Sequence, residues 1–304
     1  MKIIFIPKYF MGLIATFVKK IIKTKIIWQL PKKNKLLLYD AFENNFLTEF
    51  LEPWNPTLFY ARHEYIYIPV FFLCLFRFKN LRDAYFETFI KFVSPELIIT
   101  FTDNAEYFYK ISKKNKKIKT IFIQNGWRAY YGDIFEKLNN LNIKKLIDLK
   151  VDHKICFGSI NNKYYSKYLD GEGEINIGSI KNNYFPNRVC KDKNLIIYIS
   201  QWNDSNFKTS TFDIPRDIFF KPTDSLIINF LADYCAENKK KFKVLLRNSS
   251  NKNNNSLEKE KDYFRSMCSR SIKFIETNTN FNSYDACDSA EIVVGTESTL
   301  LYES

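Results

Sequence analysis

The sequence has 304 residues, of which 46% are hydrophobic and 17% aromatic. A chain of this length can bury one large core or two smaller ones, and its composition excludes a disordered or collagen-like protein. The net charge of +13 favours phosphate-bearing or anionic partners. No recognised nucleic-acid-binding motif accompanies this charge, so nucleic acid is not an expected partner.

The cysteines and histidines predict neither a disulfide framework nor a metal site. The six cysteines are scattered without a CxxC pair, and His63 and His153 have no metal-ligand spacing. We therefore expect reduced thiols, a cytoplasmic location and no bound metal.

Residues 1–35 form a basic N-terminal segment. The apolar residues 3–18 fall short of the about 20 residues that a bilayer span needs, and no small-residue cleavage site follows them. Apolar residues then recur at helical spacing between lysines. Two interpretations stay open: a basic amphipathic helix on the anionic inner face of a membrane, or an ordinary helix packed on the first domain.

From residue 36 onward, short apolar segments alternate with longer amphipathic ones. In chain order, we predict strands at 36–40, 57–60, 97–101, 120–123, 152–157 and 173–177. The strongly apolar run 66–76 leads into a predicted helix that ends at residue 90, and a second helix is predicted over 105–112. After the polar segment 178–193, strands are predicted at 194–201, 242–246, 272–275 and 292–295, and helices at 225–238, at 258–269 and from near 298.

This alternation predicts an α/β protein with two Rossmann-like domains, at residues 36–190 and 191–304. The sequence ends inside the last predicted helix, so we expect the second domain to be truncated at its C-terminus.

Residues 293–303 (VVGTESTLLYE) place hydroxyl side chains directly after a predicted strand. The first turn of a helix has unpaired N–H groups and a partial positive charge, which together bind phosphate. Glu303, one turn deeper, could accept hydrogen bonds from sugar hydroxyls. Alternatively, Ser298 is only a helix N-cap. The predicted nucleotide-binding residues of this segment are Gly295, Thr296, Ser298, Thr299 and Glu303.

Residues 120–128 (TIFIQNGWR) end another predicted strand with polar side chains, and open α/β sheets bind ligands at the carboxyl ends of their strands. Arg128 could bind a carboxylate or phosphate through two hydrogen bonds. Asp133 is a candidate catalytic base or a partner of Arg128. A surface turn with a solvated arginine is the alternative. The predicted substrate-binding residues here are Gln124, Asn125, Gly126 and Arg128.

Other strand ends add further candidates. Asp103, a candidate catalytic residue, and Asn104, a candidate substrate-binding residue, follow the strand at 97–101, and they could equally cap the next helix. His63 could act as a proton shuttle or be purely structural. Gln201 and Arg247 end the first two strands of the second domain, and Arg247 is the better candidate cation for a diphosphate.

Several segments, taken in order, resemble a family of surface carbohydrate biosynthesis proteins found among O-antigen and capsule enzymes. The resemblance extends over roughly residues 36–304, and the last segment is also similar to nucleotide-binding segments of GT-B glycosyltransferases and sugar 2-epimerases. The segments are TFTDNAEYFYKIS, KTIFIQNGWR with the following GDIF, YSKYLDGEGEINIGSIKNN and VVGTESTLLYE.

The resemblance implies a bacterial GT-B glycosyltransferase that uses a nucleotide sugar as its substrate and needs no cofactor. No carboxylate-rich metal motif such as DxD lies at a predicted strand end, so we expect the enzyme to be metal-independent. Ser298, Thr299 and Glu303 would bind the donor nucleotide, and residues 124–128 would face the donor sugar. Retaining transferases of acidic keto-sugars match this stretch only in part, because Asn125 stands where a carboxylate is expected. That difference would leave Asp133 or Asp103 as the nucleophile.

The expected partners are a nucleotide-sugar donor on the second domain and a glycan or lipid-linked glycan acceptor on the first. Two alternatives remain: a nucleotide-sugar epimerase of the same fold, and a truncated, non-catalytic assembly protein.

Overall fold

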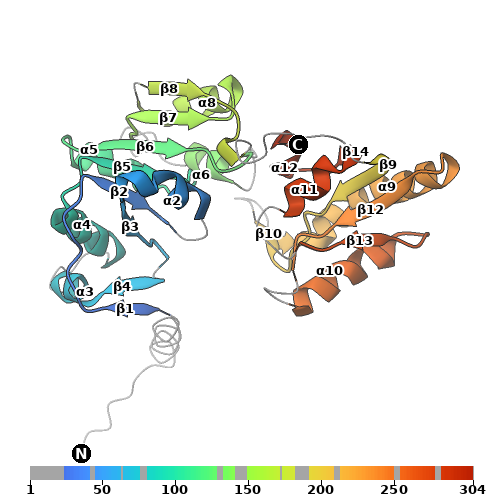
Figure 1. Cartoon of the computed structure of the whole chain (residues 1–304), viewed down its shortest axis with the longest axis horizontal. Coiled ribbons are helices and arrows are strands. Elements are labelled where there is room, and N and C mark those ends of the chain that lie inside the picture. Colours follow the sequence, from blue (N-terminus) through green and yellow to red (C-terminus); the bar gives the residue numbers. More distant parts are fainter. Residues whose placement is uncertain are drawn as a thin grey trace, which may run out of the picture. The chain divides into compact units, whose positions relative to one another are not determined.

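The computed structural model describes most of the chain (Figure 1). The described residues are 24–41, 45–62, 64–75, 81–128, 133–140, 149–171, 173–181, 192–208, 213–249, 254–277 and 282–303. His63 and residues 1–23 of the N-terminal segment lie outside this set, so their predicted roles stay predictions.

Two compact units make up the chain. The first contains residues 1–125 and 142–177, and the second contains residues 126–141 and 178–304. Residues 126–141 were expected in the first domain, whereas they belong to the second unit.

The first unit is built on a parallel six-stranded sheet with strand order β3-β2-β5-β6-β7-β8. Its strands are β2 (Leu36–Tyr39), β3 (Thr57–Phe59), β5 (Leu97–Thr100), β6 (Lys119–Ile123), β7 (His153–Cys156) and β8 (Gly173–Asn176). All four residues of β2 are buried, as expected for a central strand that is covered on both faces.

Helices and a small second sheet surround these strands. They are α2 (Asn45–Leu51), η1 (Glu52–Trp54), α3 (Ile68–Leu75), α4 (Leu81–Val93), η2 (Phe108–Lys110), α5 (Ile111–Lys114) and α8 (Ser159–Ser166), with the parallel pair β1 (Lys25–Ile27) and β4 (Tyr65–Tyr67). The core is strongly aromatic: Phe59 packs on Phe86 and Phe89 of α4, with ring centroids 4.3 and 5.0 Å apart.

The predicted helix over 105–112 starts later in the structure. Residues 102–107 form turns, and helical backbone begins only at Phe108. Asp103 therefore does not cap a helix: its side chain is buried and accepts a hydrogen bond from the Tyr165 hydroxyl at 2.6 Å.

The second unit has a parallel four-stranded sheet with strand order β13-β12-β9-β14. The strands are β9 (Asp192–Ile199), β12 (Lys241–Leu245), β13 (Lys273–Ile275) and β14 (Ala290–Val294). A separate antiparallel pair joins β10 (Asn206–Lys208) to β11 (Asp213–Pro215).

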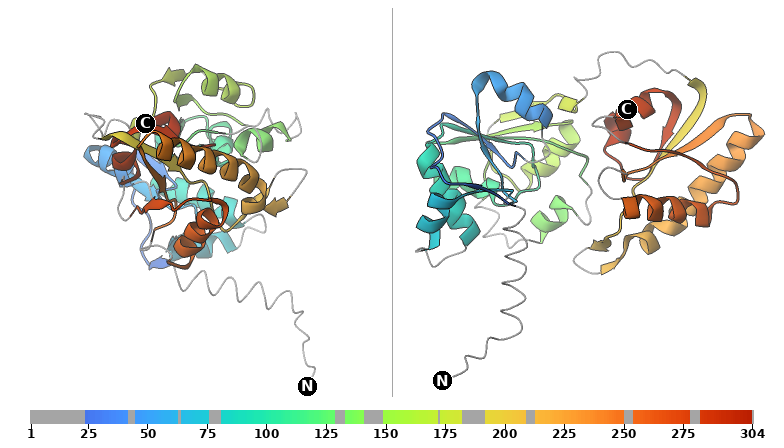
Figure 2. Two further views of the ribbon diagram at one scale, coloured as in Figure 1. Left: turned by 90° about the vertical axis from the view of Figure 1, so that its right-hand side faces the viewer. Right: turned by 60° about the horizontal axis from the view of Figure 1, so that its bottom comes forward.

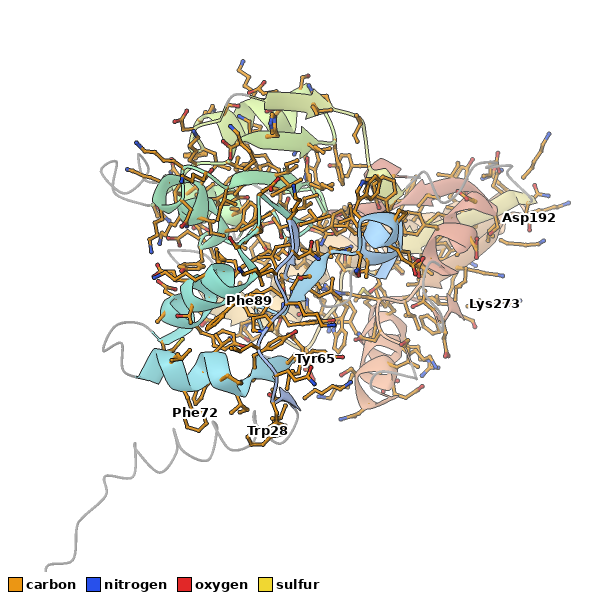
Figure 3. All side chains as sticks on the ribbon, turned by 60° about the vertical axis from the view of Figure 1, so that its left-hand side comes forward. Trp28, Tyr65, Phe72, Phe89, Asp192 and Lys273 are labelled. Atoms are coloured by element: carbon orange, nitrogen blue, oxygen red, sulfur yellow. The ribbon has the colours of Figure 1, made fainter. Side chains whose placement is uncertain are left out.

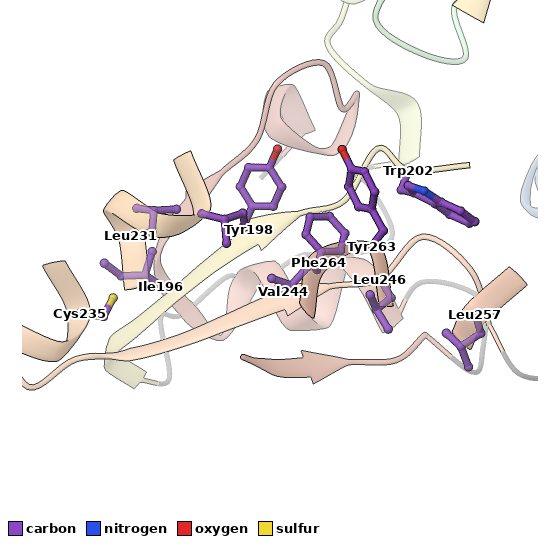
Figure 4. Packing of buried hydrophobic residues seen from close by; sticks show 11 residues of the cluster. Ile196, Tyr198, Trp202, Leu231, Cys235, Val244, Leu246, Leu257, Tyr263 and Phe264 are labelled. Atoms are coloured by element: carbon purple, nitrogen blue, oxygen red, sulfur yellow. The ribbon is translucent and has the colours of Figure 1, made fainter. Parts of the chain in front are cut away.

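Helices cover both faces of this sheet (Figure 2). On one face, α9 (Arg216–Glu237) and α10 (Asn254–Met267) bury a cluster that includes Tyr198, Val244 and Phe264 (Figure 4). On the other face, α11 (Asn282–Asp288) and α12 (Leu300–Glu303) pack on Ile197 and Leu245. The remaining helix of the unit is α6 (Ile134–Asn139). The prediction of an α/β protein with parallel sheets is confirmed.

Helix α9 begins nine residues before its predicted start at residue 225. Pro222 lies inside it, although proline removes one backbone donor and usually marks a helix start or break. Within the described part of the chain, no helix is both long and apolar enough to cross a bilayer.

A candidate ligand pocket in the second unit

A pocket of about 560 Å³ lies at the carboxyl ends of the four strands of the second unit. Its lining includes Ile199 after β9, Leu245 at the end of β12, Thr277 after β13 and the residues that follow β14. The chain builds the sheet from β9 outward through β12 to β13 and then returns to place β14 on the opposite side of β9. The pocket therefore lies at a topological switch point, where open α/β sheets bind their ligands.

Charged side chains of both signs line this pocket. The cationic lining residues are Arg128, Lys181 and Arg247, and the acidic ones are Asp133, Glu297 and Glu303. Arg247 is exposed, and its guanidinium donates a 3.4 Å hydrogen bond to the carbonyl oxygen of Gln201. No carboxylate among the described residues pairs with Arg247. Its positive charge is thus available to an anionic ligand.

Glu260 of α10 holds the backbone that carries Arg247. Its carboxylate is fully buried and accepts hydrogen bonds from the backbone N–H groups of Arg247 and Asn248, both at 2.9 Å. The Asn248 side-chain amide and the Ser200 hydroxyl donate to the same carboxylate. Glu260 therefore fixes the ends of β9 and β12, the two strands that carry Ser200, Gln201 and Arg247 into the pocket.

Glu260 was not among the predicted site residues, although the sequence contains a signal for it. Glu260 lies on the face of α10 that buries Leu257 and Phe264, at spacings of three and four residues. A carboxylate on an apolar helix face must find hydrogen-bond donors when it is buried, because a buried charge without partners is very costly.

The segment after β14 differs from its predicted form. Helix α12 begins at Leu300 and has only four residues, and the Ser298 hydroxyl accepts a 3.3 Å hydrogen bond from the Leu300 backbone N–H. Ser298 thus caps the first turn of this helix, the alternative left open by the sequence.

Thr299 joins this segment to residues 126–141. Its hydroxyl oxygen accepts a 2.9 Å hydrogen bond from the Trp127 backbone N–H. A Cβ atom at Gly126 would lie only 2.8 Å from the same oxygen, so only glycine allows this approach. The Trp127 ring also stacks on Tyr302.

Glu303 is almost completely buried at the wall of the pocket. Its two carboxylate oxygens accept hydrogen bonds from the hydroxyl groups of Ser179 and Tyr284. These contacts fix the carboxylate in place, and its predicted role toward a ribose stays a prediction.

Arg128 and Asp133 form an ion pair at 3.4 Å on the pocket wall. Asp133 is also the N-cap of α6, because its side chain accepts a 2.7 Å hydrogen bond from the Ile134 backbone N–H. Both residues come from the segment 126–141, and they thus meet Gln201, Arg247, Ser298, Thr299 and Glu303 in one pocket.

Other predicted site residues lie elsewhere. Gln124 belongs to the first unit, where its buried side chain accepts a 2.9 Å hydrogen bond from the Phe157 backbone N–H. Asp103, Asn104 and Asn125 also belong to the first unit. Gly126, Gly295 and Thr296 lie in the second unit but outside the pocket lining. Across the described ranges, no cluster of three or more His, Cys, Asp or Glu side chains could hold a metal ion.

The fold and the pocket define an α/β protein with parallel sheets and a polar ligand pocket at the carboxyl ends of its strands. A family model described as "putative O-antigen biosynthesis protein" matches residues 121–304, and the chain belongs to this family. The match spans well over half of the chain and includes every residue that lines the pocket. Among curated proteins, the comparison finds no match.

Proposed function

We propose that this protein is a GT-B glycosyltransferase that moves a sugar from a nucleotide-sugar donor to an O-antigen or capsule acceptor. The second unit binds the donor, and its pocket accepts the nucleotide diphosphate. The observation that carries this proposal is the Arg247 guanidinium, which has no acidic partner among the described residues and lies in a pocket at the switch point of a parallel sheet.

The chemistry of glycosyl transfer fits these residues. Breaking the bond between the sugar and the diphosphate leaves negative charge on the phosphate, and a preorganised cation stabilises that charge. Arg247 supplies such a cation, and Glu260 holds its backbone in place. Asp133 lines the same pocket and is the candidate catalytic carboxylate. The family name points to O-antigen biosynthesis, the setting in which such a transfer is required.

The test is a thermal-shift screen of the full chain against CMP, UDP, GDP and CDP. A nucleotide that binds only the folded state, at a concentration about 100 times its Kd, stabilises that state by about 2.7 kcal/mol. We expect one nucleotide to raise the melting temperature of the wild type and Arg247→Ala to abolish the shift. Arg265→Ala removes an exposed arginine of the same unit that pairs with Asp262 outside the pocket, and this control should keep the shift.

Glu303→Ala is a poorer test, because removing a buried carboxylate that two hydroxyl groups contact destabilises the unliganded protein as well. If no nucleotide shifts the melting temperature, the proposal fails. If a nucleotide binds, incubation with the corresponding nucleotide sugar separates two activities. Release of free nucleotide supports transfer, whereas inversion at a sugar carbon with the nucleotide still attached would indicate an epimerase.

A further inference from the structure

Large apolar side chains are exposed together at one edge of the first unit. Ile26 and Trp28 lie in or directly after β1, Leu30 follows, and Phe72 and Leu73 belong to α3. Strand β1 pairs with β4, and α3 begins at the residue after β4, so these elements adjoin one another (Figure 3). Trp28 is 74% exposed and Phe72 is 56% exposed. We call these five residues the Trp28 surface.

Helix α3 has an unusual composition for a helix with an exposed side. Its sequence, IPVFFLCL, contains no charged or amide side chain. Val70 and Cys74, one turn apart, are completely buried, whereas Phe72 and Leu73 face away from the protein. Helices that are apolar on all sides are normally covered on all sides. The exposed side of α3 is therefore suited to contact with another apolar surface.

Exposed lysines accompany the Trp28 surface in the segment that contains Trp28. Lys25, Lys32 and Lys33 are exposed, and none of them pairs with a carboxylate in the part of the chain that the structure describes. Lys25 lies over the Tyr65 ring instead, 5.4 Å from its centroid. Residues 24–39 contain four lysines and neither Asp nor Glu. Every charged side chain in this described segment is therefore a lysine.

We propose that the Trp28 surface binds the headgroup layer of an anionic lipid bilayer. Tryptophan is enriched at the boundary between headgroups and acyl chains, where its ring is partly apolar and its N–H stays hydrated. Phe72 and Leu73 enter the outer acyl region beside it, and the lysine ammonium groups contact lipid phosphates. This inference concerns the first unit alone and does not depend on the glycosyltransferase proposal.

The same charge argues against a second copy of the chain as the occupant. A two-fold symmetric dimer through this surface would bring the lysines of one copy opposite those of the other. Like charges at such short range repel, and no acidic side chain accompanies them in residues 24–39 to compensate.

The experiment is co-sedimentation of the full chain with vesicles of 70% phosphatidylcholine and 30% phosphatidylglycerol, and with pure phosphatidylcholine vesicles. We expect binding to the anionic vesicles only, with partitioning reduced about tenfold or more by Trp28→Ser or Phe72→Ser, since each removes an inserted apolar side chain. Charge reversal at Lys25, Lys32 and Lys33 should weaken binding by at least about fivefold for each lysine.

Phe230→Ser is the matched control, because Phe230 is 66% exposed on α9 of the second unit, outside the Trp28 surface. It should leave partitioning unchanged, and all the single variants should keep the wild-type melting temperature. Equal binding to both kinds of vesicle, or full binding by Trp28→Ser and Phe72→Ser, overturns the proposal. So does a dimer, seen by analytical ultracentrifugation, that Trp28→Ser dissociates.

Discussion

Trp127 lies flat on Tyr302, with ring centroids 4.1 Å apart and ring planes inclined by only 10°. These residues are distant in sequence, and the hydrogen bond from the Trp127 backbone to Thr299 joins the same two segments. Together, the stack and the hydrogen bond hold Trp127 against α12, and the next residue, Arg128, lines the pocket together with Asp133.

The stack should appear as a coupling energy in unfolding experiments. In a double-mutant cycle with Trp127→Ala and Tyr302→Ala, we expect the two losses of unfolding free energy to be non-additive by about 0.5–1.5 kcal/mol, the usual energy of an aromatic pair. Urea unfolding of the four proteins measures this. Trp127→Ala combined with Phe230→Ala should be additive, and additivity in both pairs would contradict a stabilising stack.

Gly126→Ala should destabilise the second unit by about 1–3 kcal/mol, because the new methyl group would overlap the Thr299 hydroxyl. Displacing that hydroxyl also breaks its hydrogen bond with Trp127. Thr299→Ala removes the overlapping atom, so Gly126→Ala should cost much less in that background. An equal cost in both backgrounds would show that backbone conformation, not the close approach, requires glycine.

Glu260→Gln should loosen the ends of β9 and β12, because the Gln amide group would face donors that need an acceptor. We expect a loss of about 1–3 kcal/mol in unfolding free energy and faster hydrogen exchange at the amides of Arg247 and Asn248. Nucleotide affinity should fall as well.

Asp224→Asn is the matched control for Glu260→Gln. Asp224 is a buried carboxylate of α9 that accepts hydrogen bonds from the hydroxyls of Tyr198 and Tyr263, at 2.5 and 2.8 Å, outside the pocket. Its loss should destabilise the protein without affecting the Arg247 and Asn248 amides. If both variants speed exchange at these amides equally, Glu260 has no specific role in positioning them.

Asp152 should make the stability of the first unit depend on acid pH. Burial raises the pKa of Asp152, but hydrogen bonds from Ser112 and Thr120 and the charge of Lys119 outweigh burial and lower it below its ordinary value of 3.8. A carboxyl group whose pKa is lower in the folded state stabilises that state above its unfolded pKa, and this contribution is lost as the pH falls through the folded pKa.

We therefore expect the unfolding free energy to fall more steeply below about pH 4 in the wild type than in Asp152→Asn. Unfolding by urea between pH 2 and 7 measures both profiles. Asp262→Asn, which removes an exposed carboxylate paired with Arg265, should follow the wild-type profile. Parallel profiles for wild type and Asp152→Asn would exclude the proposed contribution.

The strands were predictable because each one is a short apolar run that ends in polar residues. All ten predicted strands occur within a few residues of their expected bounds, and their parallel pairing follows from the helices between most of them. The strand ends also indicated Gln201, Arg247 and Ser298, because the carboxyl ends of parallel strands meet at one edge of a sheet.

Features that depend on tertiary contacts could not be predicted in this way. The early start of α9 was hidden by Pro222, and β10 and β11 have only three residues each, too few to give a recognisable strand pattern. Which unit holds Trp127 depends on contacts with Thr299 and Tyr302, far along the chain, so no local pattern reveals it.

The two units of this protein do not follow one another along the chain, because residues 126–141 belong to the second unit. The chain passes from one unit to the other after Asn125, Leu141 and Ile177. A single recombination junction therefore cannot exchange either unit intact. A hybrid that inherits residues 178–304 alone would take Arg247 and Tyr302 from one parent and Trp127, Arg128 and Asp133 from the other. Such hybrids would retain a complete pocket only if both parents share these contacts, so the two units are expected to be inherited together.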